Sequence, residues 1–232
     1  MTDRRSVKER PESWGRKHIT GWPRLEPPAF IAACVVIGVI IFIILEPLPG
    51  VKPGTLHEVA VFAGFMLAPL ALLLVTGRRL GLGGLDRFLP MGIGLYMLFF
   101  LSLVALVPFN RGFFEGYRMT PATAVAWALL TLIQVSSVDF FTKRIVQLEA
   151  ERRWGPSIAM GAQFAAWCIG HVPEYFWLKD LTTPFGAVLF LGFTGATTGW
   201  FFYKTKNVLG MMLGHWLLNL LLAGTAIFYF GL

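Results

Sequence analysis

The chain has 232 residues, of which 56% are hydrophobic and only 14% are charged. A soluble globular domain has about a quarter charged residues, so this composition excludes an ordinary water-facing surface. The same figures exclude an intrinsically disordered chain and a secreted disulfide scaffold. The composition is that of an integral membrane protein.

The first 28 residues are polar and basic, and they hold no short apolar stretch of the kind that a cleavable signal peptide requires. We expect residues 1–28 to form a cytoplasmic arm that lies partly on the membrane surface. Three transmembrane helices are then expected in residues 29–119, and a core of four further transmembrane helices in residues 120–232.

Seven apolar stretches follow the arm, each close to the roughly 20 residues that a spanning helix requires. The sequence therefore predicts an all-α fold, a polytopic transmembrane helix bundle with about seven spans. The predicted spans are residues 29–48, 57–76, 91–109, 121–141, 160–178, 184–203 and 208–230.

The basic residues predict the orientation of the bundle. Sixteen of the 20 Lys and Arg residues fall in the N-terminal arm and in alternate loops, and the other four fall on the opposite side. Because cytoplasmic loops are enriched in Lys and Arg, we expect a cytoplasmic N-terminus and a location in the inner (plasma) membrane. This asymmetry and the attraction to anionic lipids account for the net charge of +7, so we expect a lipid bilayer as partner and no nucleic acid.

Polar side chains within the spans gather in the last four helices. A charged or imidazole side chain at membrane depth is costly and usually faces the bundle interior for a functional reason. Asp139 lies in the fourth predicted span, His171 in the fifth, and His215 and Asn219 in the seventh. Residues four apart share a helix face, so His215 and Asn219 can address one bound atom or water. Trp167 and His171 are paired in the same way.

Two pairs of glycines in the same half of the chain have the GxxxG spacing. They are Gly195 with Gly199, and Gly210 with Gly214. This spacing allows helix backbones to approach closely in lipid. We interpret both pairs as packing motifs, the second of which would bring His215 close to another backbone.

From about residue 134 to residue 222 the chain resembles the CPBP family, also called Abi, of intramembrane endopeptidases, which includes the type II CAAX prenyl proteases. The family pattern has Glu-Glu-xxx-Arg on one helix, Phe-xxx-His on the next, and His-xxx-Asn or His-xxx-Asp on a later one. His215-xxx-Asn219 matches the third motif, and Trp167-xxx-His171 is similar to the second. The resemblance implies an endopeptidase that cleaves a membrane-associated or lipidated peptide with an activated water.

The first motif departs from the family pattern, and two registers are open. In one, Asp139 replaces the first Glu and Arg144 is the motif arginine. In the other, Val138 and Asp139 replace the two glutamates, and Lys143 takes the arginine position. The first register keeps the carboxylate that activates water in the family, whereas the second keeps an ion pair between residues four apart but no base. We favour the first register, because it preserves both a base and an arginine.

The depth of the site is a second consideration. If the fifth helix entered the membrane at Ser157, His171 would lie about 21 Å from the inner face at 1.5 Å per residue, too deep to meet Asp139. We therefore expect residues 143–157 to extend beyond the bilayer, and Pro173 to kink the fifth span just after His171.

The resemblance implies catalytic roles for four residues. Asp139 would act as general base on a water, His171 and His215 would position that water, and Asn219 would stabilise the oxyanion. Glu174, three residues after His171, is the reserve base. We expect no metal or other cofactor, although His171, His215 and Asp139 would form a zinc shell if all three converged.

The missing Glu-Glu pair supports an alternative function. A catalytically impaired family member would act as a binding, scaffold or regulatory subunit of a membrane protein complex. In a third hypothesis, His171 or His215 ligates a haem or chlorin within the bundle. The expected partner beyond the bilayer is a membrane-associated protein or peptide, either as substrate or in a complex.

Overall fold

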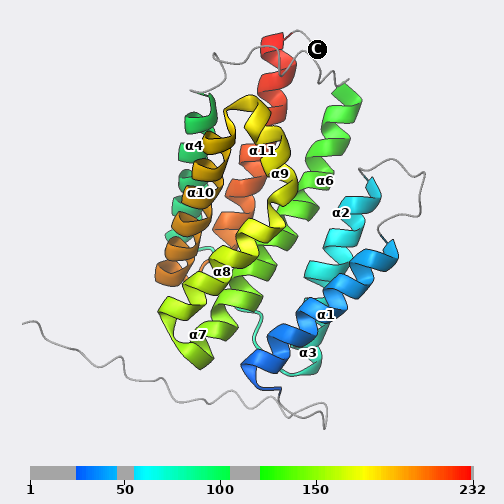
Figure 1. Ribbon diagram of the computed structural model, residues 1–232, viewed down its shortest axis with the longest axis vertical. Helices are drawn as coiled ribbons and strands as arrows, with labels where there is room; N and C mark the ends of the chain where they lie inside the picture. Colours follow the sequence, from blue (N-terminus) through cyan, green and yellow to red (C-terminus); the bar gives the residue numbers. More distant parts are fainter. Residues whose placement is uncertain (1–24, 46–54, 105–120, 231–232) are drawn as a thin grey trace, which may run out of the picture.

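The computed structural model describes residues 25–45, 55–104 and 121–230, and this part of the chain forms helices joined by short connections, with no strand (Figure 1). The prediction of an all-α fold is confirmed. The elements are α1 (Pro27–Leu45), α2 (Thr55–Phe62), the π-helix η1 (Ala63–Leu67), α3 (Ala68–Val75), α4 (Phe88–Val104), α6 (Pro121–Asp139), the π-helix η3 (Phe140–Gln147), α7 (Leu148–Trp154), α8 (Pro156–Gly170), α9 (Val172–Leu181), α10 (Pro184–Thr205) and α11 (Leu209–Phe230).

Every predicted apolar stretch overlaps one or more of these helices. Among the described residues, α1 and α10 are long and apolar enough to cross a membrane, and shorter apolar helices cover Val59–Val75, Phe88–Leu103 and Leu209–Leu221. The number of spans and their direction stay predictions. So does the division into an arm and two sets of helices, and the arm lies almost entirely outside the described residues.

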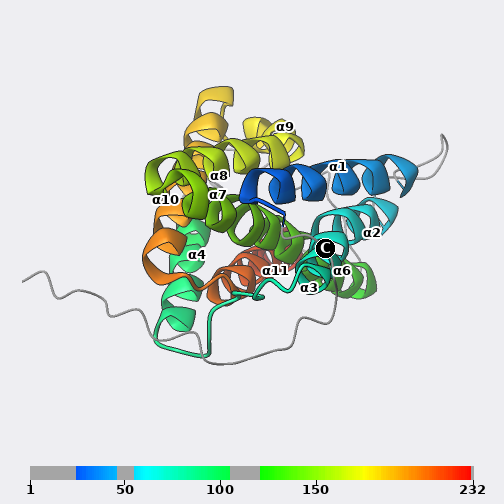
Figure 2. The same ribbon diagram turned by 90° about the horizontal axis from the view of Figure 1, so that it is seen from below.

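The rod formed by α6, η3 and α7 runs through the middle of the bundle without a break (Figure 1). Seen from below, α8 and α1 lie on one side of this rod and α11 on the other (Figure 2). All eight residues of η3 are buried, although this segment includes Lys143 and Arg144, which the sequence places in a basic loop. The apolar side of η3 packs into a core cluster with Phe30 of α1 and Leu73 of α3.

Glycines bring α11 against α4. A Cβ on Gly214 would lie 2.9 Å from the carbonyl oxygen of Gly92, and one on Gly210 would lie 2.6 Å from that of Leu89. A side chain at either position would therefore force the two backbones apart, which is the role expected for the second GxxxG pair. This close contact places His215, the next residue of α11, beside α4.

The fifth predicted span is two helices rather than one. It is interrupted at His171, whose φ of −104° and ψ of 14° are not helical, between the end of α8 and the start of α9. Pro173 occupies the first turn of α9, and its missing N–H cannot continue the hydrogen-bond ladder of α8. The expected kink is present, but it lies at His171 itself and not after it.

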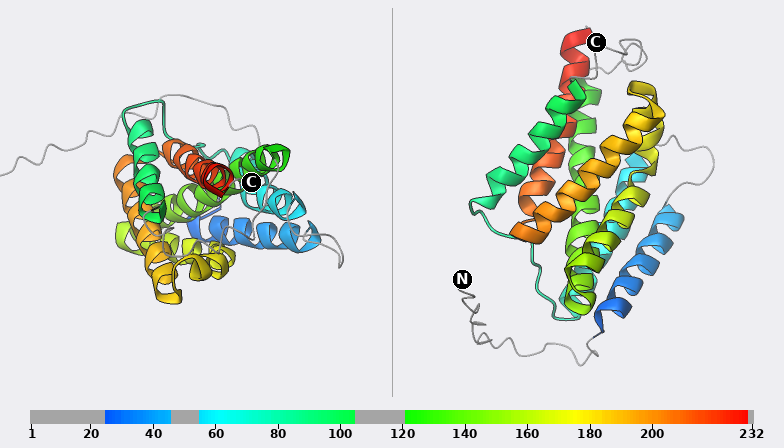
Figure 3. Two further views of the ribbon diagram at one scale, coloured as in Figure 1. Left: turned by 90° about the horizontal axis from the view of Figure 1, so that it is seen from above. Right: turned by 60° about the vertical axis from the view of Figure 1, so that its left-hand side comes forward.

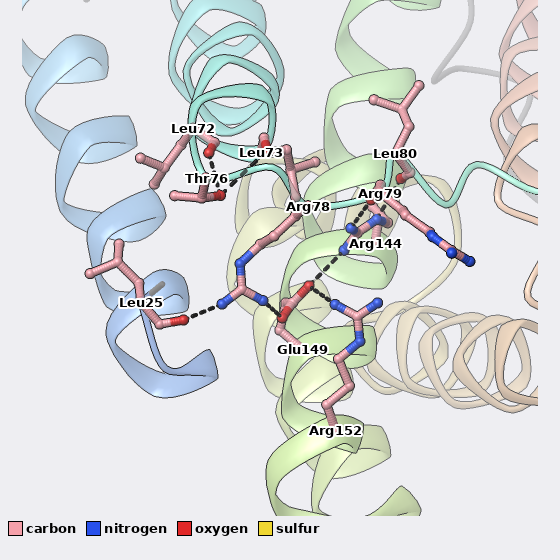
Figure 4. Close-up of polar contacts among 10 residues, drawn as sticks. All are labelled: Leu25, Leu72, Leu73, Thr76, Arg78, Arg79, Leu80, Arg144, Glu149 and Arg152. Atoms are coloured by element: carbon pink, nitrogen blue, oxygen red, sulfur yellow. Dashed lines mark hydrogen bonds and ion pairs between the residues drawn. The ribbon is translucent and has the colours of Figure 1, made fainter. Parts of the chain in front are cut away.

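Three segments with predicted inside-facing basic residues meet at the lower end of the bundle. The side chain of Asn207 donates a hydrogen bond of 2.8 Å to the carbonyl of Gly84, and Lys206 pairs with Glu151 of α7. Arg78, in the segment after α3, pairs with the buried Glu149 of α7 (Figure 4). These three segments therefore share one end of the molecule, as the positive-inside pattern predicts of them.

Candidate active site

A fully buried carboxylate, Asp139 at the end of α6, is the centre of the site. The ammonium group of Lys143 lies 2.6 Å from Oδ1, and Nδ1 of His215 lies 3.2 Å from Oδ2. The hydroxyl of Tyr96 on α4 donates to the same carboxylate, at 3.2 and 3.3 Å from its two oxygens. Three donors from three helical segments therefore surround Asp139, which satisfies a charge that would otherwise be very costly to bury.

The local structure explains why these groups meet. Lys143 is one turn beyond Asp139, so the pair forms within a single rod. Tyr96 and His215 are brought together by the glycine contact between α4 and α11, and their rings stack with centroids 4.9 Å apart and an interplanar angle of 12°. The contact between Asp139 and His215 then joins the rod to these two helices.

The two histidine rings and the indole of Trp167 form one cluster. The imidazole centroids lie 5.9 Å apart with an interplanar angle of 14°. The indole of Trp167 stacks on His171 at 3.8 Å and lies 5.7 Å from the ring of His215, and the ammonium group of Lys143 lies 4.3 Å from the centroid of the Trp167 ring. Histidines from α11 and from the break after α8 are thus held in parallel, and both are at least nine-tenths buried.

Hydrogen bonds assign the tautomer of each imidazole. Nδ1 of His215 faces a carboxylate, and Nδ1 of His171 lies 2.8 Å from the carbonyl oxygen of Trp167. Both partners accept hydrogen bonds only, so Nδ1 carries the proton in each neutral ring. The other nitrogen, Nε2, is then a lone-pair acceptor in both rings and is available to a ligand or a water.

A cavity of about 50 Å³ opens beside the two histidine rings. One water needs roughly 10–15 Å³ measured in this way, so the cavity has room for water and for part of a small group. His171, His215 and Asn219 line it together with Glu174, the reserve base. Most of its other walls are apolar, from α4, α9, α10 and α11: Phe99, Leu103, Leu178, Phe190, Leu191 and Leu218.

Arg144, the motif arginine of the first register, lies apart from this site. Its guanidinium donates to the carbonyls of Arg79 and Leu80 and pairs with Glu149 at 3.0 Å (Figure 4). Glu149 also accepts from Arg78 and from Arg152, and Arg78 donates in addition to the carbonyl of Leu25, just before α1. These contacts of Arg144 therefore hold the segment after α3 against the rod.

The structure combines one contact expected from each of the two alignments of the first motif. Asp139 contacts His215, as the first register expects, and it pairs with Lys143, as the second register expects. Val138 lies towards α8, where its Cγ1 is 4.0 Å from the position of a Cβ on Gly170. The carboxylate thus belongs to the histidine site and is also neutralised by a lysine.

Two residues important to this arrangement are absent from the sequence prediction. Tyr96 is a polar side chain in a third span that otherwise carries almost none, which is a signal that could have identified it. Glu149 gives no such signal, because it lies in a charged stretch that looks like a solvated helix face. Among the described residues, no group of three His, Cys, Asp or Glu side chains is placed to hold a metal ion.

Fold and site define a helical protein with apolar helices and a buried site of carboxylate, imidazole and amide side chains. Residues 119–221 match the family model described as type II CAAX prenyl endopeptidase Rce1-like. The family of this model is the CPBP family, which the histidine motifs predict, and it is generally one of membrane-embedded proteases. No curated protein matches the chain, and no solved structure matches it.

Proposed function

We propose that the protein is an intramembrane endopeptidase whose reaction takes place in the cavity beside His171 and His215. The observation that carries the proposal is the convergence of His171, His215 and Asn219 on this one cavity, with Asp139 in contact with His215. A packing role alone would not require two parallel imidazoles with free Nε2 atoms beside a cavity, and the family match supports proteolysis.

The contacts of Asp139 indicate which roles Asp139 and His215 have in the reaction. Its oxygens already accept from Lys143, Tyr96 and His215, so the carboxylate is poorly placed to take a proton from water itself. It instead holds His215 in the tautomer with Nε2 unprotonated and stabilises the imidazolium that forms when Nε2 accepts a proton. His215 is therefore the general base. Asp139 positions its imidazole ring and stabilises the positive charge that the ring gains.

The remaining groups complete a hydrolytic reaction. The water oxygen attacks the scissile carbonyl carbon while its proton passes to Nε2 of His215. The carboxamide of Asn219 donates to the oxyanion that forms, and Nε2 of His171 accepts a hydrogen bond from the same water. When the C–N bond breaks, the proton on His215 passes to the leaving amine. Glu174 stays the reserve base.

The apolar walls of the cavity favour a membrane-associated or lipidated peptide as substrate. We place the protein in the inner membrane with a cytoplasmic N-terminus, because its basic residues are so unequally divided. We also propose that the reaction uses no metal, since Asp139 is held by Lys143 and faces the proton-bearing nitrogen of His215.

Purified protein in liposomes tests the proposal. One quenched fluorescent peptide carries a farnesyl cysteine three residues before its C-terminus, and a second is anchored by an apolar helix. Cleavage of either by the wild-type chain should fall about 10²–10⁴-fold in His215→Ala, the loss expected for a general base, and should also fall in His171→Ala. The matched control, Cys168→Ala, should keep full activity. Folded protein that cleaves neither peptide, or His215→Ala protein with wild-type activity, would contradict the proposal.

One observation favours the alternative function. Asp139 and Lys143 form a fully buried ion pair, which would be retained in a family member that binds a membrane partner and no longer hydrolyses peptides. In that case His215→Ala would leave the function of the protein intact, and a partner would co-purify in stoichiometric amount. The two functions therefore give opposite results for the same variant.

A further inference from the structure

Four buried polar atoms near the site have no hydrogen-bond partner among the described residues. They are both amide atoms of Gln163, Oε1 of Gln147 and the indole Nε1 of Trp167. Gln147 and Gln163 are completely buried, and Trp167 is 2% exposed. An unsatisfied buried donor or acceptor costs about 1–3 kcal/mol, and native proteins normally satisfy such groups with protein or ordered water.

The side chains that carry these atoms lie one after another along a single line. Gln163, Trp167 and His171 follow one another at intervals of four, so they share a face of α8 that leads to the cavity. Helix α10 lies against this face (Figure 3). Gly199 of α10 is next to Gln163, and the amide of Gln147 donates a hydrogen bond of 2.8 Å to the Gly199 carbonyl.

Two glycines of α10 provide the space along the line. A Cβ on Gly195 would lie 2.5 Å from Cδ1 of Trp167 and 3.0 Å from its Nε1, and a Cβ on Gly199 would overlap the amide oxygen of Gln163. The first GxxxG pair therefore makes room for two polar side chains, in addition to allowing the helices to pack.

The far end of the line reaches the polar end of the bundle. Glu151 is four residues beyond Gln147 and lies on the same face of the rod. It pairs with Lys206, and the side chains of the two residues are 22% and 40% exposed. The line thus runs from a solvated ion pair, through Gln147 and Gln163, to Trp167 and the histidines.

We propose that this line is a file of bound water that supplies the hydrolytic site from the Glu151–Lys206 end. Each turnover consumes one water molecule, yet both histidines are at least nine-tenths buried and most of the cavity walls are apolar. Waters that bridge Gln147, Gln163 and the Trp167 indole satisfy the four unpaired atoms and pass water to His171. This inference rests on the proposed function for its purpose, but the hydration itself does not depend on catalysis.

Hydrogen exchange of tryptophan indole groups tests the file without any assay of activity. The indole of Trp216 donates a hydrogen bond of 2.8 Å to the carbonyl of Ala128 and serves as an internal control. With ¹⁵N-labelled protein in micelles, we expect the Trp167 indole N–H to exchange about tenfold faster than that of Trp216, the effect of one protein hydrogen bond. Trp167→Phe and Trp216→Phe assign the two signals.

Replacement of the central amide tests the path. Gln163→Leu removes the polar atoms at nearly constant volume, and we expect it to slow Trp167 exchange towards the rate of Trp216. The matched control is Gln134→Leu on α6, which should change nothing. Equal or slower exchange at Trp167 in the wild type, or exchange that Gln163→Leu does not affect, overturns the proposal. The wild-type comparison decides alone if the variant does not fold.

The enzymatic measurement separates this inference from the proposed function. If the protein cleaves the test peptides, Gln163→Leu should lower kcat while KM stays unchanged, because water supply and not peptide binding is affected. If kcat/KM falls only because KM rises, with kcat unchanged, the result would count against the file. If no peptide is cleaved, the exchange result still stands as the test of hydration.

Discussion

The buried pair of Asp139 and Lys143 makes a quantitative prediction about stability. Both side chains are 0% exposed and 2.6 Å apart. Lys143→Met removes the charge and keeps most of the volume, which leaves the carboxylate with Tyr96 and His215 alone. Breaking a buried pair by removing one partner costs about 3–5 kcal/mol. At roughly 2–4 °C per kcal/mol for a chain of this size, the unfolding temperature should fall by about 6–20 °C.

Thermal unfolding in detergent micelles, followed by circular dichroism, measures this effect. The double variant Asp139→Asn, Lys143→Met contains neither charge and should recover much of the loss, because the uncompensated carboxylate is gone. The matched control is Lys204→Met, an exposed lysine whose loss should change stability by less than about 0.5 kcal/mol. The reasoning is refuted if Lys143→Met unfolds at the same temperature as Lys204→Met.

Three further predictions concern packing and hydrogen bonding. Gly214→Ala should lower the free energy of unfolding by about 1–3 kcal/mol, because the added methyl group overpacks against α4. Gly192→Ala, whose Cβ would meet nothing within 4 Å, should be neutral or stabilising. The denaturant midpoints of the two variants compare these effects. Glu149→Gln should lower the free energy of unfolding by about 3–5 kcal/mol by leaving buried arginine charge, while Arg152→Ala should cost at most about 1 kcal/mol. Tyr96→Phe should cost about 1.5–3 kcal/mol for a lost bond to a carboxylate and should lower kcat; wild-type stability would contradict that role.

Much of the fold is predictable because helices that cross a membrane require long apolar stretches, which are visible in the sequence. Runs of about 20 apolar residues predict the apolar helices, though not α7 or most of η3. The spacing of four between His215 and Asn219 places both side chains at one cavity. Pro173 predicts a kink after His171, whereas the break lies at His171 itself, because a proline acts on the residues before it.

The identity of the groups around Asp139 is less accessible to the sequence. The choice between Arg144 and Lys143 depends on which way two adjacent side chains turn in a π-helix, and regular 3.6-residue periodicity does not describe that segment. Tyr96 reaches the carboxylate only because glycines allow α4 and α11 to touch. Long-range packing of this kind has no local pattern.

The water file illustrates the same limit. Gln163, Trp167 and His171 share a spacing that is visible in the sequence, but their function depends on what faces them. The structure places two glycines and a second glutamine there. The unsatisfied polar atoms become evident only when burial and hydrogen bonding are known for each atom.

The central claim is that Asp139 acts through His215 to activate water for peptide hydrolysis. The most direct test is the kcat and KM of Asp139→Asn protein in liposomes, normalised to the folded fraction. The account predicts that kcat falls about 10²–10⁴-fold, with KM unchanged, because the amide no longer stabilises the imidazolium of His215. A kcat within about threefold of the wild type, which is below the 1.4 kcal/mol of a tenfold effect, would contradict it.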